Sequence, residues 1–158
     1  RVSSANIIAF DLDPKARSLC LQLATLNNVA NRIQINSFCT ADFIAAFGFV
    51  DKALVICDCE GFEKNLFTET SVRNLRTCDL LVETHDFIDI GISTYLAKLF
   101  SSTHNIQVFK SIDDIEKAKT YEFRELKDFN LSDRKKILRE GRPAIMEWFW
   151  LTPKSDNN

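Results

Sequence analysis

Short apolar runs alternate with amphipathic segments along most of this 158-residue chain, and this alternation restricts its fold more than any other feature. The run from Ala53 to Cys57 (A-L-V-I-C) is typical of a strand that is buried on both faces. An amphipathic helix is expected to begin at Asp13-Pro14, with Asp13 as its N-cap and Pro14 in its first turn. Strands that alternate with helices favour a mostly parallel sheet covered by helices. The sequence therefore predicts an α/β fold.

The same pattern places the other elements by residue number. Strands are expected over residues 6–10, 33–36, 53–57, 79–83, 106–109 and 144–151, and helices over residues 13–27, 41–47, 62–75, 90–100 and 132–140. An apolar stripe is expected to lay the first helix on the sheet, and it consists of Ala16, Leu19, Cys20 and Leu23. The interpretation is one domain over residues 1–153, followed by a disordered tail over residues 154–158.

Charge, hydropathy and cysteine usage exclude several classes of protein. The formal net charge of −2 gives no attraction to nucleic acid, and no apolar run has the length of a membrane span. Five cysteines, an odd number scattered through apolar stretches, indicate reduced thiols in a cytoplasmic protein. Cys57 and Cys59 would share one face of a strand, but no second pair completes a zinc site.

Acidic side chains follow the expected strands at the points where they end. Asp11 ends the first strand, Asp58 and Glu60 follow the third, and Glu83 lies with His85 at the end of the fourth. Ligands of open α/β sheets bind beyond the carboxyl ends of the strands. These positions are therefore the candidate functional residues.

The chemistry of two strand ends can be argued from the residues themselves. Asp11 could accept hydrogen bonds from the ribose diol of a nucleotide cofactor such as S-adenosylmethionine (SAM) or NAD. The alternative is that Asp11 is a solvated loop residue. No structural role explains the two carboxylates of Asp58 and Glu60, so these residues are expected to be functional. Gly61 permits the tight turn that follows them. Glu63 is explained by the favourable field of a helix N-terminus.

His85 is the candidate general base, because an imidazole can take a proton from an acceptor hydroxyl near neutral pH. Glu83 or Asp86 could orient its ring. The alternative is a surface histidine fixed by neighbouring carboxylates. A metal held by Asp58, Glu60 and His85 is a minor alternative, and no metal site is expected.

Four segments of the chain resemble the FkbM-type group of S-adenosylmethionine (SAM)-dependent methyltransferases. They are I-I-A-F-D-L-D-P at residues 7–14, I-C-D-C-E-G-F-E at 56–63, D-L-L-V-E-T-H-D at 79–86 and M-E-W-F-W-L-T-P-K at 146–154. They occur in the family's order and cover most of the chain. The family's first strand and its glycine-rich loop would precede residue 6, and no G-x-G occurs anywhere in this sequence.

The resemblance implies a three-layer Rossmann-like methyltransferase fold with strand order 3-2-1-4-5-7-6, in which the last strand is antiparallel and the first is missing here. A missing central strand would leave two strand edges exposed. The resemblance also implies positions for SAM: Asp11 would hold its ribose, and Leu12, Cys39 and Thr40 would lie beside its adenine. Asp58 would lie near its methionine end.

The function that the resemblance implies is SAM-dependent methyl transfer, with a hydroxyl of a small molecule or a sugar as acceptor. His85 and Asp58 would be catalytic, and Glu60 and Glu83 would face the acceptor. Activity is expected of the complete protein, whereas the chain without the glycine loop is expected to bind SAM poorly. The alternatives are a non-catalytic Rossmann-like scaffold or interaction domain and an NAD-dependent oxidoreductase.

Overall fold

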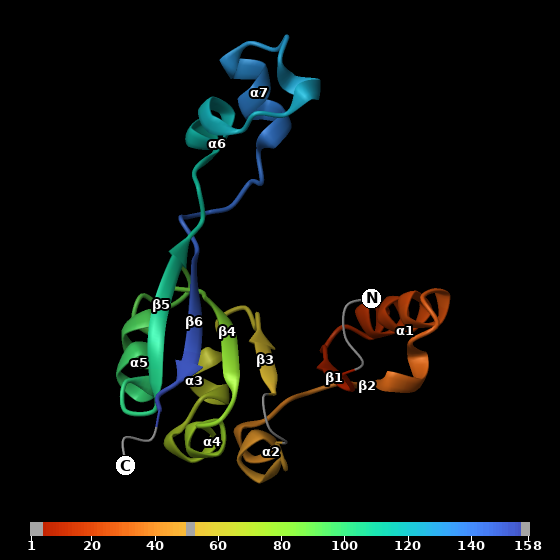
Figure 1. Cartoon of the computed structure of the whole chain (residues 1–158), viewed down its shortest axis with the longest axis vertical. Coiled ribbons are helices and arrows are strands. Elements are labelled where there is room, and N and C mark those ends of the chain that lie inside the picture. The colour runs from red at the N-terminus through yellow and green to blue at the C-terminus, as the bar shows by residue number, and fades with distance from the viewer. Residues whose placement is uncertain (1–4, 50–52, 156–158) are drawn as a thin grey trace.

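The chain folds into two separate sheets with α/β architecture in a computed structural model that describes residues 5–49 and 53–155. In the first unit, β1 (Ile7–Phe10) pairs in parallel with β2 (Ile33–Asn36), and α1 (Pro14–Leu26) and the short turn η1 (Ala30–Arg32) connect them. Asp13 is the N-cap of α1 and accepts a hydrogen bond from the Lys15 amide, as the sequence predicts. Figure 1 shows this unit standing apart from the larger sheet.

The larger sheet has four strands in the order β3-β4-β6-β5. Their bounds are Leu54–Cys57 for β3, Asp79–Thr84 for β4, Glu147–Pro153 for β6 and His104–Lys110 for β5. Strands β3 and β4 are parallel, whereas β6 runs antiparallel to both of its neighbours. Helix α2 (Ala41–Ala46) links the first unit to this sheet, and α5 (Ile92–Phe100) leads from β4 to β5.

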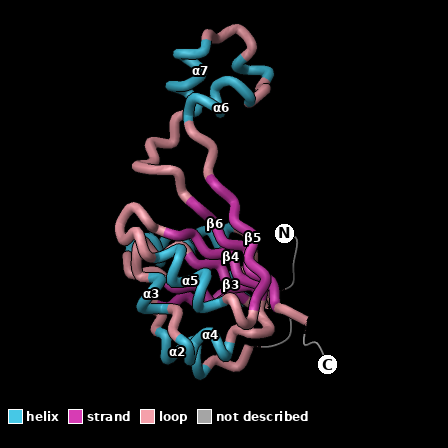
Figure 2. Tube along the Cα trace, turned by 90° about the vertical axis from the view of Figure 1, so that its left-hand side faces the viewer, coloured by secondary structure: helices cyan, strands magenta, loops and turns pink. Residues whose placement is uncertain are grey.

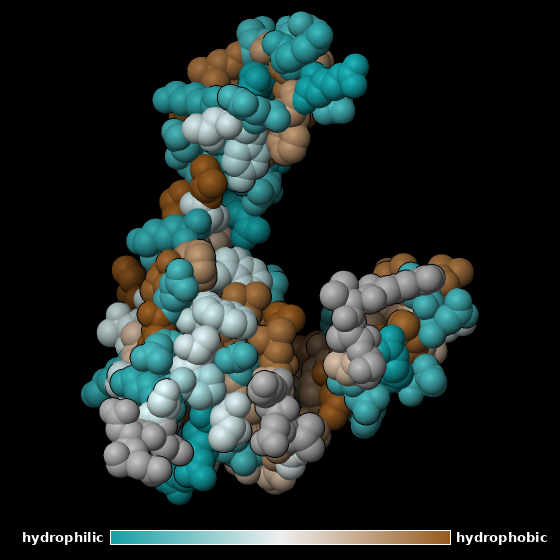
Figure 3. Space-filling view, in the orientation of Figure 1, coloured by the Kyte–Doolittle hydropathy of each residue, from teal (hydrophilic) through white to brown (hydrophobic). Residues whose placement is uncertain are grey.

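This arrangement confirms the expected strand order and the antiparallel last strand. The order reads β2-β1 in one sheet and β3-β4-β6-β5 in the other, with the break where the expected first strand would lie. The β3 edge is exposed, as expected for a sheet without its central strand. Figure 3 shows hydrophobic side chains over this edge of the sheet.

The prediction that β3 is buried on both faces is wrong. Cys57 is buried and Val55 packs against the core, but 53% of Leu54 and 65% of Ile56 are exposed. The helices α2 to α5 lie on one face of the sheet (Figure 2), so alternate side chains of β3 have no covering layer among the described residues. An apolar run indicates a strand but does not report how many layers cover it.

The apolar stripe of α1 also lies differently from the prediction. Leu19 and Leu23 are 57% and 59% exposed, and Ala24 is the buried residue of this helix. The reason is the width of the partner, because a sheet of two strands cannot cover the whole stripe of a helix of this length.

One long helix was predicted over residues 62–75, and the structure divides it in two. Helix α3 (Glu63–Leu66) ends before Phe67, and α4 (Glu69–Asn74) begins after the N-cap Thr68. Thr68 and Ser71 exchange side-chain and backbone hydrogen bonds in a capping box, which satisfies donors that a continuous helix would bond internally. This interruption directs Phe67 into the core, where it is fully buried.

The core of the larger sheet lies between its strands and helices α3 to α5. Its members are buried apolar side chains: Ile44, Cys57, Leu66, Phe67, Val72, Leu75, Cys78, Leu80, Val82, Ile92, Leu96, Phe100, Phe149 and Leu151. The cluster spans elements from α2 to β6 and therefore packs α2 and residues 53–153 into one unit, apart from the segment between β5 and β6. The sequence predicts a disordered tail over residues 154–158. The Lys154 amide donates a hydrogen bond to the Thr103 carbonyl, and residues 156–158 lie outside the described residues.

The segment between β5 and β6 forms a projecting arm (residues 111–146; Figure 1). It contains α6 (Asp114–Thr120), η2 (Arg124–Leu126) and α7 (Leu131–Leu138). The sequence predicted α7 within two residues but not α6. The Arg134 guanidinium donates to the Ala118 and Tyr121 carbonyls and so ties α7 to the end of α6. None of the described helices is long and apolar enough to cross a membrane.

His104 at the start of β5 makes folding stability depend on pH. It is 1% exposed, its Nε2 lies 3.0 Å from the Cys78 carbonyl oxygen, and burial lowers its pKa. Below about pH 6.5 the unfolded chain therefore binds a proton that the folded chain does not bind, and stability is lost as the pH falls. We expect urea unfolding to show a smaller loss between about pH 8 and pH 5 for His104→Gln than for the wild type. Equal losses would contradict this role.

Candidate functional site

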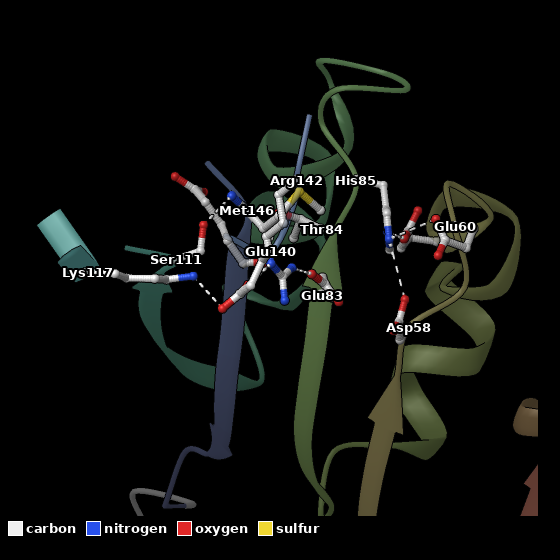
Figure 4. A network of polar contacts seen from close by, with 12 residues as sticks. Asp58, Glu60, Glu83, Thr84, His85, Ser111, Lys117, Glu140, Arg142 and Met146 are labelled. Carbon is white, nitrogen blue, oxygen red and sulfur yellow. Dashed lines mark hydrogen bonds and ion pairs between the residues drawn. The ribbon is translucent and has the colours of Figure 1, made fainter. Parts of the chain in front are cut away.

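Two adjacent parallel strands bring Asp58 and His85 together. Asp58 follows β3 and His85 follows β4, so both lie at the carboxyl edge of the sheet. The His85 Nε2 lies 3.4 Å from an Asp58 oxygen and 3.5 Å from a Glu60 oxygen (Figure 4). The imidazole is 3% exposed, whereas the Asp58 and Glu60 side chains are 49% and 78% exposed. The ring is therefore held inside the protein with one nitrogen directed to an open acidic rim.

The residue that orients His85 is Glu63, for which the sequence predicts only a structural role at a helix N-terminus. Glu63 is fully buried, and one of its carboxylate oxygens makes a short contact with the His85 Nδ1. The expected partners are engaged elsewhere: Asp86 accepts a hydrogen bond from the Ser93 amide, and Glu83 binds Arg142. An Nδ1 proton donated to Glu63 leaves the Nε2 lone pair facing the rim.

The turn between β3 and α3 places these carboxylates. Glu60 and Gly61 have φ values of 52° and 94°, and the Gly61 amide donates to the Glu63 carboxylate. A Cβ at Gly61 would lie 3.0 Å from an Ile88 side-chain carbon, so both the space and the backbone angle require glycine. This agrees with the tight turn that the sequence predicts. Glu60 holds a left-handed conformation without being glycine, which is typical of a functional turn.

Arg142 connects the arm to the site. Its Nη1 donates to a Glu83 oxygen at 2.9 Å, and its Nε donates to Glu140 at 2.5 Å. Glu140 also binds Lys117 of α6, so an ion-pair chain runs from β4 into the arm. The hydrogen bond that Arg142 donates to Glu140 is the main reason that the pKa of Arg142 is raised. No pattern in the sequence predicted this contact, because it joins residues 59 positions apart.

Acidic groups outnumber basic ones around His85. Four carboxylates (Asp58, Glu60, Glu63 and Glu83) lie here with the guanidinium of Arg142, and one oxygen of Glu63 is buried without a hydrogen-bond partner. Asp58, Glu83 and His85 each offer a ligand atom, and these atoms lie within 4.8 Å of one another. The three residues could hold a divalent cation, although Arg142 already occupies one Glu83 oxygen. The site favours a ligand that carries positive charge.

Of the residues expected beside the ribose and the adenine, Asp11 and Leu12 lie outside this cluster, whereas Cys39 lies near Cys59 of the site turn. Asp11 and Leu12 follow β1 in the first unit, and Asp11 accepts a hydrogen bond from the Asp13 amide at 2.8 Å. Leu12 is 72% exposed. Thr40 is the N-cap of α2, and the half-buried Cys39 packs against the core. The structure thus joins Asp58, Glu60, Glu83 and His85 in one site, while the roles of the other four stay predictions.

Comparisons with known proteins bear on the fold. No protein-family model and no curated protein matches this chain. Among solved structures, a domain assigned as a precorrin-6Y C5,15-methyltransferase from Corynebacterium diphtheriae matches with a TM-score of 0.56 and 12% identity, over 98% of this chain and 77% of that one.

Two further structures match at lower scores. Residues 942–1257 of StiE O-MT give a TM-score of 0.48 and 16% identity, over 98% of this chain and 69% of that one. A protein assigned as a sarcosine dimethylglycine methyltransferase from Galdieria sulphuraria gives 0.47 and 11%, over 96% and 70% of the two chains. The match to the Corynebacterium diphtheriae domain identifies the fold as the α/β fold of Rossmann-like methyltransferases.

Proposed function

We propose that this chain belongs to a SAM-dependent methyltransferase that transfers a methyl group to a hydroxyl of a small molecule or a sugar. The observation that carries the proposal is the buried Glu63–His85 pair, which holds Nε2 towards the carboxyl edge of a methyltransferase-type sheet. Ligands of such sheets bind at this edge. The four segments that resemble the FkbM-type group support the same function, because two of them supply Asp58, Glu63 and His85.

The protein's own residues would prepare the acceptor. His85 takes the hydroxyl proton on Nε2, and Glu63 stabilises the resulting imidazolium through Nδ1. Asp58 lies 3.4 Å from the same nitrogen and orients the acceptor hydroxyl, while Glu60 and Glu83 face the rest of the acceptor. Positioning of the two reactants supplies most of the remaining acceleration.

SAM fits the residues present in two respects. Its sulfonium is a cation, and the cluster around His85 carries an excess of carboxylates. Asp11 and Leu12 offer a carboxylate and an exposed apolar side chain at the end of β1, which suit a ribose diol and an adenine. When bound, SAM supplies an electrophilic methyl group on sulfur. The assignment of Asp11 and Leu12 rests on the resemblance.

An Asp11→Ala substitution tests the cofactor assignment. We expect the affinity for SAM, measured by calorimetry on the intact protein, to fall about 10- to 100-fold, because charge-assisted hydrogen bonds to the ribose are lost. Asp13→Ala is the matched control, since it removes a carboxylate two residues away that caps α1. It should lower stability by about 1 kcal/mol and leave SAM affinity unchanged. An unchanged affinity for Asp11→Ala would remove Asp11 from the site.

A non-catalytic scaffold is the second candidate, and the separation of the β1–β2 unit from the larger sheet favours it. SAM binding requires both units in the proposal above, whereas a scaffold requires neither Asp11 nor His85. Calorimetric titration of the intact protein with SAM separates the two functions. No heat of binding at millimolar SAM would support the scaffold and contradict the methyltransferase.

A further inference from the structure

In the candidate site, Asp58 lies between two cysteines in the sequence, Cys57 and Cys59. Cys57 ends β3 and Cys59 follows Asp58, and their sulfur atoms lie 3.5 Å apart, with the Cys57 thiol donating to the Cys59 sulfur. All five cysteines of the chain are free thiols, and no other pair of sulfurs makes a hydrogen bond among the described residues. The function proposed above makes no use of these thiols.

The two thiols differ in access and in chemistry. Cys57 is 5% exposed, whereas Cys59 is half-buried and lies in the chain between the exposed side chains of Asp58 and Glu60. The hydrogen bond to Cys59, followed by burial, raises the pKa of the Cys57 thiol above its ordinary value. Cys57 thus remains a protonated donor, and Cys59 is the sulfur that can attack an oxidant.

We propose that Cys57 and Cys59 form an oxidation site, in which a hydroperoxide oxidises Cys59 and Cys57 then closes a reversible disulfide around Asp58. The sulfur contact of 3.5 Å needs a further approach of about 1.5 Å to reach disulfide length. Exposed carboxylates of Asp58 and Glu60 flank Cys59 and repel anionic oxidants such as glutathione disulfide. A neutral peroxide is not repelled.

The reaction balances in two steps. The Cys59 sulfur attacks a peroxide oxygen and the O–O bond breaks, which gives a sulfenic acid on Cys59 and releases water or an alcohol. The Cys57 sulfur then attacks the Cys59 sulfur, the S–O bond breaks, and the departing hydroxide leaves as water with the Cys57 proton. The two thiols together lose two electrons, and the peroxide gains them.

The geometry makes this disulfide a switch rather than a permanent bond. Residues two apart on an extended backbone lie about 6.6 Å apart, near the upper limit for bridged cysteines. Closure therefore strains the backbone at Asp58 and makes the bond easy to reduce. The same strain would move the Asp58 carboxylate away from the His85 Nε2. The resulting loss of methyl transfer rests on the proposed function, but the disulfide itself does not.

Peptide mapping of the peroxide-treated chain tests the proposal directly. Trypsin releases residues 53–64, which contain Cys57 and Cys59 and no other cysteine. After hydrogen peroxide and alkylation, we expect this peptide unalkylated and lighter by two hydrogen atoms, and dithiothreitol should restore both thiols. Three results would overturn the proposal: a peptide alkylated at both thiols while Cys20 is oxidised, a sulfinic acid on Cys59 beside a free Cys57, or a cross-link to the peptide containing Cys39.

Variants and a spectroscopic signal complete the test. Cys57→Ser should trap the Cys59 sulfenic acid for dimedone labelling, Cys59→Ser should leave Cys57 reduced, and the control Cys20→Ser should form the disulfide as before. If Cys57→Ser does not fold, the peptide mapping of the wild-type chain still tests the disulfide.

The two histidines give a second readout, because oxidation should shift the His85 ring signals in NMR spectra and leave those of His104 unchanged. An unmoved His85 would refute the displacement of Asp58 without bearing on methyl transfer.

Discussion

A His85→Ala substitution is expected to lower the free energy of unfolding by about 3–5 kcal/mol, because it leaves the Glu63 carboxylate buried without its partner. Glu63 is fully buried and one of its oxygens lacks a hydrogen-bond partner, so the contacts of its other oxygen with His85 and with the Gly61 amide compensate for its burial. Urea unfolding followed by far-UV circular dichroism measures the change. A loss below about 1 kcal/mol would show that Glu63 finds another partner in the variant.

Two further variants test whether the loss of stability comes from the buried Glu63–His85 pair. Glu60→Ala removes a carboxylate that lies 3.5 Å from the same imidazole but is 78% exposed, and it should change stability by less than about 1 kcal/mol. The double variant His85→Leu with Glu63→Leu should recover much of the stability that His85→Ala loses, because an apolar pair leaves no buried charge behind. Together they test whether the cost comes from the unpaired carboxylate rather than from the lost ring volume.

Phe67→Ala is expected to cost about 3–5 kcal/mol through the cavity that it leaves in the core. Phe67 is fully buried, and its ring meets that of Phe100 edge to face at a centroid distance of 5.4 Å. Its position between α3 and α4 joins the helices that carry Glu63 and the capping box of Thr68. The substitution should therefore loosen the turn that holds His85 as well as lower stability.

Phe109 offers the matched control for the loss of an aromatic ring. It lies on β5 and is 49% exposed, so Phe109→Ala should cost less than about 1 kcal/mol in the same urea experiment. Equal costs at the two positions would mean that the core between α3, α4 and α5 does not dominate the stability of the larger sheet.

The Glu63–His85 pair and the Cys57–Cys59 pair meet at one turn. Asp58 lies between the two cysteines and beside the imidazole, and Glu60 and Gly61 complete the turn that leads to Glu63. One short segment thus places the proposed base, its orienting carboxylate and a thiol pair that can disturb both. Substitutions at Gly61 are expected to affect all three together, because a side chain there would meet Ile88.

Much of the fold could be predicted from local patterns. The strand that ends at Asp11, the N-cap Asp13 and the strand order with its antiparallel β6 agree with the structure. The edge that remains open beside β3 also agrees, since it follows from the expected order of the strands. Boundaries were less accurate where a side-chain cap, as at Thr68, competes with helix continuation.

The sequence by itself determined which segments form strands and that acidic side chains stand at the strand ends, because these features depend on the spacing of neighbours along the chain. Only the tertiary structure decided that Glu63 rather than Glu83 or Asp86 holds His85, and that Arg142 reaches Glu83 from the arm. It also decided that Leu54 and Ile56 stay exposed. Such contacts join residues far apart in sequence, and they depend on how strands and helices pack, which no local pattern contains.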